Sequence, residues 1–139
     1  MKFGLLVIAI LLTLAASALH ADEAEAPKVH KQGGSTYVSG GGAEADRKAL
    51  FKLAPKFPIQ LIFQVGGEIE GVSGVKVTLR DQYGESMLVV VSEGPYLYIN
   101  PPAGGRFTID AEYNGEKQSQ TKDLVGRRYL VLEYKFAAK

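Results

Sequence analysis

Residues 74–84 read GVKVTLRDQYG, residues 94–99 read GPYLYI, and residues 101–115 read PPAGGRFTIDAEYNG. Apolar and polar residues alternate in the first and third stretches, which gives a β-strand one buried and one exposed face. Gly and Pro lie between the stretches and are typical of sharp turns. The pair Asn114-Gly115 predicts a two-residue hairpin turn, because a type I′ turn needs positive φ at both central positions. This part of the chain therefore predicts short strands joined by tight turns.

Further strands are expected on both sides of this part. Residues 59–65 and 129–136 show the same alternation, with every second residue apolar. Residues 87–91 are continuously apolar, which predicts a central strand covered on both sides. Residues 116–124 carry polar side chains at alternate positions and predict an exposed edge strand. About seven short strands at regular spacing indicate a mainly β fold, an antiparallel sandwich that occupies residues 56–139.

A short helix is expected ahead of the strands, in residues 43–55. Acidic Glu44 stands at its start and precedes Lys48 by four residues, an arrangement that favours a helix. Leu50 would face the sheet, and Pro55 would end the helix.

The N-terminal residues predict export. Residues 1–21 have a positively charged start, an apolar stretch and a small-residue exit, as in a secretory signal peptide. We expect cleavage after Ala21, with Ala18 as the competing position. The alternative, an uncleaved membrane anchor, is disfavoured because the apolar run is shorter than the roughly 20 residues that span a bilayer. Cleavage, together with the absence of cysteine for lipid attachment, predicts a periplasmic or secreted protein.

A flexible leader is expected in residues 22–42, because this segment is charged at first and then rich in Gly and Ser. Within it, residues 36–38 are apolar enough for a short strand, but the pattern is too brief to decide.

Size and charge limit the classes of function. Removal of residues 1–21 would leave 118 residues, the usual size of one domain, with fifteen basic and fifteen acidic side chains. Such a balance disfavours nucleic acid or an anionic membrane as a partner, because that binding depends on uncompensated cations. Arg127 and Arg128 are too few to change this, and a solvated turn is expected there.

The pattern Gly-Val-x-Val-x-Leu-x-Asp-x-x-Gly in residues 74–84, followed by a Pro/Gly turn, an aromatic residue and the alternation into Tyr113-Asn114-Gly115, resembles the carboxypeptidase regulatory-like domain. The resemblance covers residues 59–136 and implies a transthyretin-like, Ig-like sandwich in which Asp81 and Gly84 turn the chain. The whole chain also resembles small exported proteins of Gram-negative bacteria that carry this domain. One departure is an additional Gly in the turn before Phe107. These motifs specify a fold and leave the function open.

Catalytic chemistry has little support in the sequence. His30 is the only histidine after residue 21, and there is no cysteine, so a nucleophile would lack its base. Two carboxylate pairs, Glu68 with Glu70 and Asp110 with Glu112, fit solvated surfaces better than a Ca²⁺ site, which needs six or more oxygens. We therefore expect no catalytic residue, metal or cofactor.

Tyr96 and Tyr98 are the candidate binding residues. They alternate with Leu97 and Ile99, so both tyrosines would leave the core on one side and form a platform for a protein or a glycan. The alternative is that the helix of residues 43–55 covers them. Our leading hypothesis is a non-catalytic exported module with an envelope protein as partner; a glycan-binding module is second and an enzyme of unknown type third.

Overall fold

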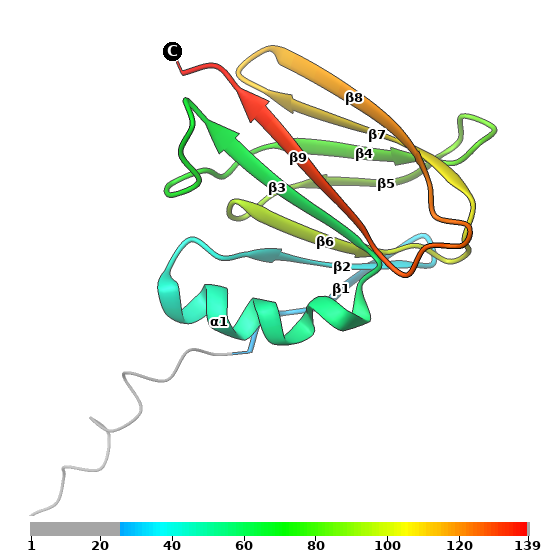
Figure 1. Ribbon diagram of the computed structural model, residues 1–139, viewed down its shortest axis with the longest axis horizontal. Helices are drawn as coiled ribbons and strands as arrows, with labels where there is room; N and C mark the ends of the chain where they lie inside the picture. The colour runs from blue at the N-terminus through cyan, green and yellow to red at the C-terminus, as the bar shows by residue number, and fades with distance from the viewer. Residues whose placement is uncertain (1–25, 139) are drawn as a thin grey trace, which may run out of the picture.

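The computed structural model of the protein describes residues 26–138; the predicted signal peptide, residues 1–21, lies outside them. This part of the chain is mainly β, and its two sheets have the arrangement of a β-sandwich (Figure 1). In spatial order the first sheet contains β1 (His30–Gln32), β2 (Ser35–Gly40), β6 (Tyr96–Asn100), β3 (Ile59–Val65) and β9 (Leu130–Phe136). The second sheet contains β5 (Ser86–Val91), β4 (Lys76–Arg80), β7 (Arg106–Tyr113) and β8 (Glu116–Asp123).

The main core lies between the two sheets and comes from alternate residues of their strands. In β9, for example, every second residue from Leu130 to Phe136 is buried. Tyr134 reaches across the core, where its hydroxyl donates a hydrogen bond to the Ile109 carbonyl at 2.7 Å. The sheets are thus joined by apolar burial and by a buried hydrogen bond, which leaves the Tyr134 hydroxyl satisfied.

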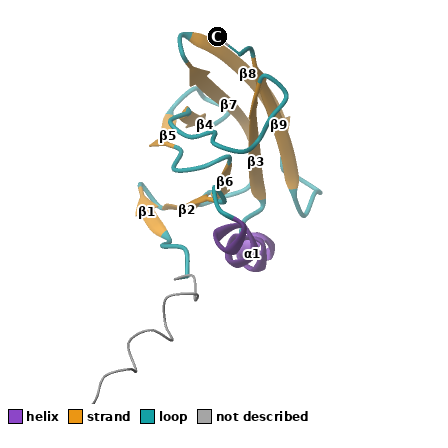
Figure 2. Cartoon of the chain, turned by 90° about the vertical axis from the view of Figure 1, so that its left-hand side faces the viewer, coloured by secondary structure: helices purple, strands orange, loops and turns teal. Residues whose placement is uncertain are grey.

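A second, smaller core lies on the outer side of the first sheet. Helix α1 (Glu44–Leu53) and the 3₁₀-helix η2 (Ala54–Lys56) cover the side of β2 and β6 that faces away from the second sheet (Figure 2). Leu50 is the fully buried residue of the helix. The expected helix and its contact through Leu50 are confirmed. Compared with the predicted residues 43–55, α1 begins one residue later and ends two residues earlier, and Pro55 lies in η2.

Several predicted turns are present. Asn114 and Gly115 connect β7 to β8 with φ of 49° and 82°, as a type I′ hairpin requires. The Asp81 carboxylate accepts hydrogen bonds from the N–H groups of Tyr83 and Glu85, both at 2.9 Å, and Gly84 has a φ of 85°. The turn that the resemblance implied at Asp81 and Gly84 is therefore formed.

The prediction of a flexible leader is wrong for residues 30–40. Strand β2 pairs with β6 from Thr36 opposite Asn100 to Gly40 opposite Tyr96, and β1 pairs with β2. Val38 is fully buried beside Tyr98, which gives this polar segment an apolar contact that its own composition does not reveal. These strands raise the number within the described residues to nine, against the expected seven.

Two further expectations about the strands are corrected. Strand β3 pairs with β9 in parallel, so the sandwich is not purely antiparallel. Strand β5 is the edge of its sheet instead of a central strand, and Val89 and Val91 are exposed there. The continuous apolar run predicted cover on both faces, but Leu88 and Val90 are buried in the core with Met87 packed against it, and the other face is open.

Candidate interaction surfaces

Tyr96 and Tyr98 are buried, so the alternative in which the helix covers them is confirmed and the exposed tyrosine platform is wrong. The two rings lie on the outer side of β6, as the alternation predicted, but the helical segment covers them. Phe51 of α1 meets Tyr96 edge to face, with ring centroids 5.3 Å apart, and Phe57 packs against Tyr98 at 6.4 Å. These contacts are those of a small core, so the face lacks the open aromatic rings that a glycan would need.

Burial also changes the acidity of two tyrosines. Burial raises the pKa of Tyr98 to about 12, and the neighbouring Tyr96 adds to this effect. Burial likewise raises the pKa of Tyr134, with a further contribution from Asp110. Both phenols therefore keep their protons to a higher pH than an exposed tyrosine would.

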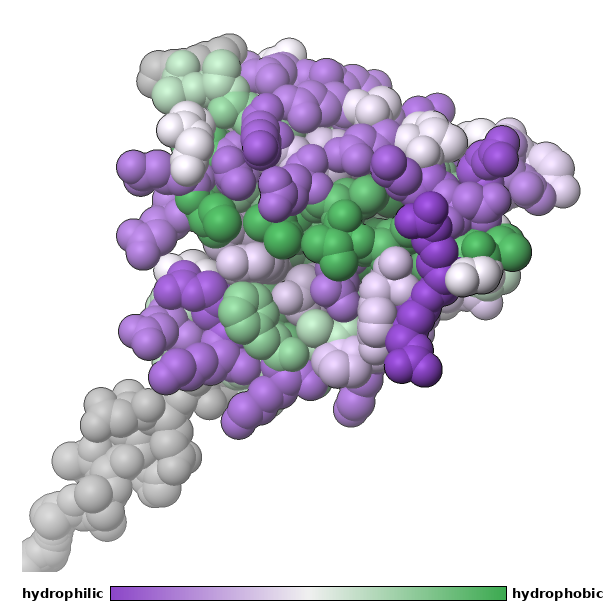
Figure 3. Space-filling view, in the orientation of Figure 1, coloured by the Kyte–Doolittle hydropathy of each residue, from purple (hydrophilic) through white to green (hydrophobic). Residues whose placement is uncertain are grey.

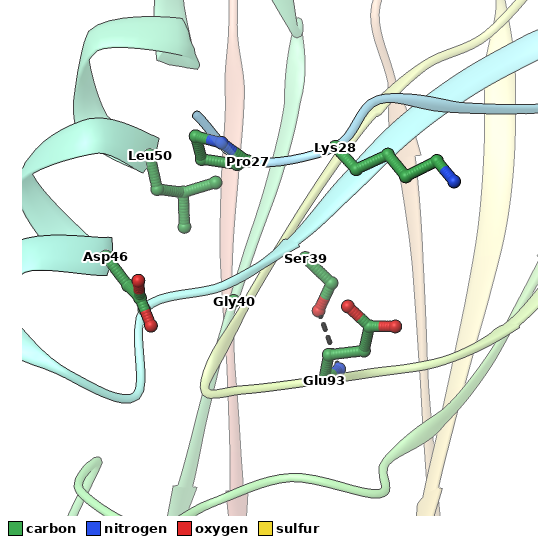
Figure 4. A pocket seen from close by; sticks show the side chains of 8 residues that line it. Pro27, Lys28, Ser39, Gly40, Asp46, Leu50 and Glu93 are labelled. Atoms are coloured by element: carbon green, nitrogen blue, oxygen red, sulfur yellow. Dashed lines mark hydrogen bonds between the residues drawn. The ribbon is translucent and has the colours of Figure 1, made fainter. Parts of the chain in front are cut away.

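A cavity of about 200 Å³ lies between the start of α1, the end of β2 and the turn that joins β5 to β6 (Figure 4). The side chains of Asp46 and Glu93 approach it from opposite sides. The only hydroxyl in its lining, that of Ser39, accepts a hydrogen bond from the Glu93 N–H at 2.9 Å and donates to the Tyr96 carbonyl at 2.8 Å. This hydroxyl is engaged, and among the described residues that line the cavity there is no histidine or cysteine to activate it as a nucleophile.

Of the four residues in the two carboxylate pairs, Asp110 alone is buried. Asp110 is buried on the outer side of β7, where it accepts hydrogen bonds from Arg80, at 2.7 Å, and from the Ser119 hydroxyl. Glu112, two residues further along β7, is exposed, as are Glu68 and Glu70. Among residues 26–138 no three His, Cys, Asp or Glu side chains are grouped in a way that could hold a metal ion.

Two of the four sheet edges are capped by side chains, and a third is short. At β5, the Gln32 amide bonds both backbone groups of Val89: its Nε2 donates to the carbonyl at 3.1 Å and its Oε1 accepts from the N–H at 2.8 Å. The edge of β9 receives side chains from β8, because Gln118 donates to the Lys135 carbonyl and Gln120 donates to the Glu133 carbonyl at 2.9 Å. Strand β1 contains only three residues. Short edges and side-chain caps are means by which proteins prevent unwanted strand pairing.

Strand β8 is the remaining edge, and it is long and regular. Its eight residues pair with β7 without a register shift, and none of them is buried. The sequence predicted this exposed edge from the alternating polar residues of 116–124, and the structure confirms it. It did not predict that Gln118 and Gln120 bridge to β9, because that contact depends on where the other sheet lies.

Hydrophobic side chains also gather on the outer side of the first sheet. Figure 3 shows them as a band that crosses this face between the helix and the strands of the second sheet. Val131 of β9 is 58% exposed and Ile62 of β3 is half-buried. The helix lies on this same side, over β2 and β6, where Ile62 packs against the helical cluster, and it leaves Val131 exposed.

No protein-family model matches the chain, and no curated protein matches it. The resemblance to the carboxypeptidase regulatory-like domain accordingly stays a prediction. In residues 26–138, no helix combines the length and the apolar character that crossing a membrane would require.

Proposed function

We propose that this protein is an exported, non-catalytic β-sandwich module that binds an envelope protein by pairing an extended segment of that partner with the edge of β8. The assignment to a transthyretin-like, Ig-like sandwich and the location in the periplasm or outside the cell are parts of the same proposal. They rest on the motif of residues 74–84 and on the signal-peptide pattern of residues 1–21.

The observation that carries the proposal is the direction of the β8 backbone groups. Tyr113 and Glu116 flank a two-residue turn and form a hydrogen-bonded pair, and such pairs alternate with non-hydrogen-bonded ones along an antiparallel ladder. Lys117, Ser119 and Thr121 therefore direct their N–H and C=O groups away from β7. A partner strand that adds to this edge would satisfy these groups by main-chain hydrogen bonds.

The comparison with the other edges favours β8. On β5, the Gln32 side chain already makes hydrogen bonds with the N–H and C=O groups of Val89. The pairing of β5 with β4 also contains a register shift between Leu79 and Arg80. On β9, two backbone carbonyls accept hydrogen bonds from the side chains of Gln118 and Gln120. A partner strand would have to displace these caps, whereas on β8 it meets an eight-residue ladder.

The alternative of a glycan-binding tyrosine face is not proposed, because Tyr96 and Tyr98 are buried beneath α1 and η2. An enzyme is not favoured either. Neither of the two cavities described by the structure contains Asp110 or Glu112, the acidic pair that would have suggested catalysis.

The test is cross-linking in the native host with an epitope-tagged protein, followed by mass spectrometry of the recovered material. The decisive variant is Lys117→Pro, which removes an N–H that points away from β7 and therefore leaves the ladder with β7 intact. Its matched control is Lys117→Thr, which also removes the charge but keeps the N–H.

We expect one specific protein to be recovered with the wild type and with Lys117→Thr, and to be lost with Lys117→Pro. Denaturation curves of the three proteins should agree within about 1 kcal/mol, because the substituted N–H makes no bond within the sheet. Equal recovery with the proline variant would exclude the β8 edge as the binding surface. Recovery of no protein above a mock sample would contradict the proposed function itself.

A further inference from the structure

Four exposed cations from two distant parts of the sequence lie at one corner of the molecule. Lys52 and Lys56 belong to the end of the helical segment, and Arg127 and Arg128 to the turn between β8 and β9. The two parts are joined by hydrogen bonds: the Tyr129 hydroxyl donates to the Pro55 carbonyl at 3.3 Å, and the Leu130 N–H donates to the Pro58 carbonyl at 2.7 Å. We call this surface, with Tyr129 and Val131, the basic corner.

The cations of the basic corner are not neutralised by carboxylates. Among the described residues, none of the four takes part in an ion pair. The acidic residues nearest to Arg127 and Arg128 in the sequence face other cations: Asp123 lies 4.0 Å from Arg106, and Glu133 lies 4.0 Å from Lys135. The corner thus carries positive charge although the chain as a whole is nearly neutral.

Apolar and aromatic side chains accompany these charges. Tyr129 is 37% exposed and Val131 is 58% exposed. Val131 lies opposite Gln60 in the parallel ladder, and the Gln60 amide donates to the Ala54 carbonyl, so Val131 is held beside the end of the helix. Lys and Arg next to exposed aromatic and aliphatic side chains are typical of protein surfaces that lie at a bilayer interface.

We infer that the basic corner binds the surface of an anionic lipid bilayer. The charge of the corner is complementary to lipid phosphates, and Tyr129 and Val131 can enter the region between headgroups and acyl chains. An acidic peptide fits less well, because its recognition by cations needs charge alone, whereas Tyr129 and Val131 are exposed beside the cations here. The corner is formed by a helix end and a turn, and none of its residues lines either described cavity.

This inference differs from what net charge predicts. The chain has fifteen basic and fifteen acidic residues after residue 21, and this balance argued against an anionic membrane as a partner. That argument holds only if the charges are evenly spread over the surface. The fold brings residues 52–56 and 127–131 together. Binding at an interface depends on the local charge within a Debye length, which is about 8 Å at physiological salt.

The experiment is co-sedimentation of the protein, purified from its host in the form that the cell makes, with two kinds of vesicle. One kind is phosphatidylcholine alone, and the other is an equimolar mixture of phosphatidylcholine and phosphatidylglycerol. Binding to the neutral vesicles is subtracted, because an uncleaved N-terminal apolar segment would bind both kinds.

Two variants with equal loss of charge make the test specific. The corner variant combines Lys52→Gln, Lys56→Gln, Arg127→Gln and Arg128→Gln. The matched control combines Lys31→Gln, Lys76→Gln, Lys117→Gln and Lys122→Gln, which are exposed cations outside the corner and outside the ion pairs of the described chain. A single change, Val131→Thr, tests the apolar contribution.

We expect the corner variant to bind anionic vesicles on the order of a hundredfold more weakly than the wild type, and the matched control to change by less than about fivefold. Val131→Thr should weaken binding by about threefold, and added salt should weaken the binding of the wild type. Equal loss in the two four-residue variants, or equal binding of the wild type to both kinds of vesicle, would overturn the inference. Either result leaves the β8 proposal unaffected, because the corner and the β8 edge share no residue.

Discussion

The outer face of the first sheet is apolar where helix α1 covers it, whereas the outer face of the second sheet is polar on β4, β7 and β8 and, within residues 26–138, carries no helix. On the first, Val38, Tyr96 and Tyr98 pack against Leu50 and Phe57. On the second, the corresponding positions of β4, β7 and β8 hold Thr78, Asp110 and Ser119, which lie side by side in the ladder. Each sheet therefore has one face in the main core and an outer face of a different kind.

Burial on the two outer faces has different causes. Tyr96 and Tyr98 are buried because another element lies on them, which removes apolar area from water. Asp110 is buried by its neighbours in the sheet, since Arg80 and Ser119 both donate hydrogen bonds to its carboxylate. A buried charge is tolerated only when it is paired in this way. The difference shows that low exposure on a sheet face does not by itself identify a surface that another element covers.

The largest effect is expected from Leu50→Ala on the covered face. Leu50 is fully buried between α1 and the tyrosines, so the substitution leaves a cavity and should lower the free energy of unfolding by about 2–5 kcal/mol. Chemical denaturation measures this loss. Lys48→Ala, on the exposed side of the helix, is the control and should change stability by less than about 0.5 kcal/mol. A similar small value for Leu50→Ala would mean that the helix contributes little to the fold.

A smaller loss is expected from Asp110→Ala on the open face. The substitution leaves the Arg80 guanidinium and the Ser119 hydroxyl without their acceptor, and the free energy of unfolding should fall by about 1–3 kcal/mol. The lower part of this range is favoured because 38% of the Arg80 side chain is exposed and water can solvate it. A double-mutant cycle with Arg80→Ala measures the coupling. Coupling near zero would indicate that the pair is incidental to the stability of this face.

The smallest effect that we expect is a pH dependence of the unfolding free energy caused by Tyr98 on the covered face. The pKa of Tyr98 is about 12 in the folded protein and 10.0 without burial, so the native state holds its proton more tightly than the unfolded chain. The stabilisation is therefore complete below pH 10 and is lost as pH rises towards 12.

The variant Tyr98→Phe has no phenol at this position, so we expect it to lack the part of the pH dependence of stability that Tyr98 causes. The difference in unfolding free energy between wild type and variant should change by about 1–2 kcal/mol between pH 10 and pH 12, as measured by denaturation at several pH values. At neutral pH the two proteins should be similarly stable. An unchanged difference across this range would show that Tyr98 is accessible to water, and the contrast between the two faces would then be weaker than we describe.

Local pattern was sufficient for much of the fold. The alternation in residues 129–136 and in residues 106–113 identified which side chains face the core, because the side-chain period of a strand is two. The pair Asn114-Gly115 identified the hairpin that ends in β8, since few residues adopt its backbone conformation. The sequence therefore predicted β8 as the exposed edge strand that we propose as the binding surface.

Other features depended on contacts between distant residues. Strand β2 forms only because β6, about 60 residues later, offers it a partner. The apolar run in β5 looked central, but the position of a strand in a sheet depends on the order in which the strands pair. The basic corner needs residues 52–56 and 127–131 to meet, and neither segment alone carries a distinctive charge.

The sequence by itself determined that Tyr96 and Tyr98 leave the main core on the same side, that a short helix precedes the strands, and that residues 116–123 present a polar edge. Only the tertiary structure decided that the helix lies over those two tyrosines and that four cations gather beside Val131. The physical reason is that alternation and turn conformation are properties of neighbouring residues. Cover, strand order and local charge arise from packing between segments far apart in the chain.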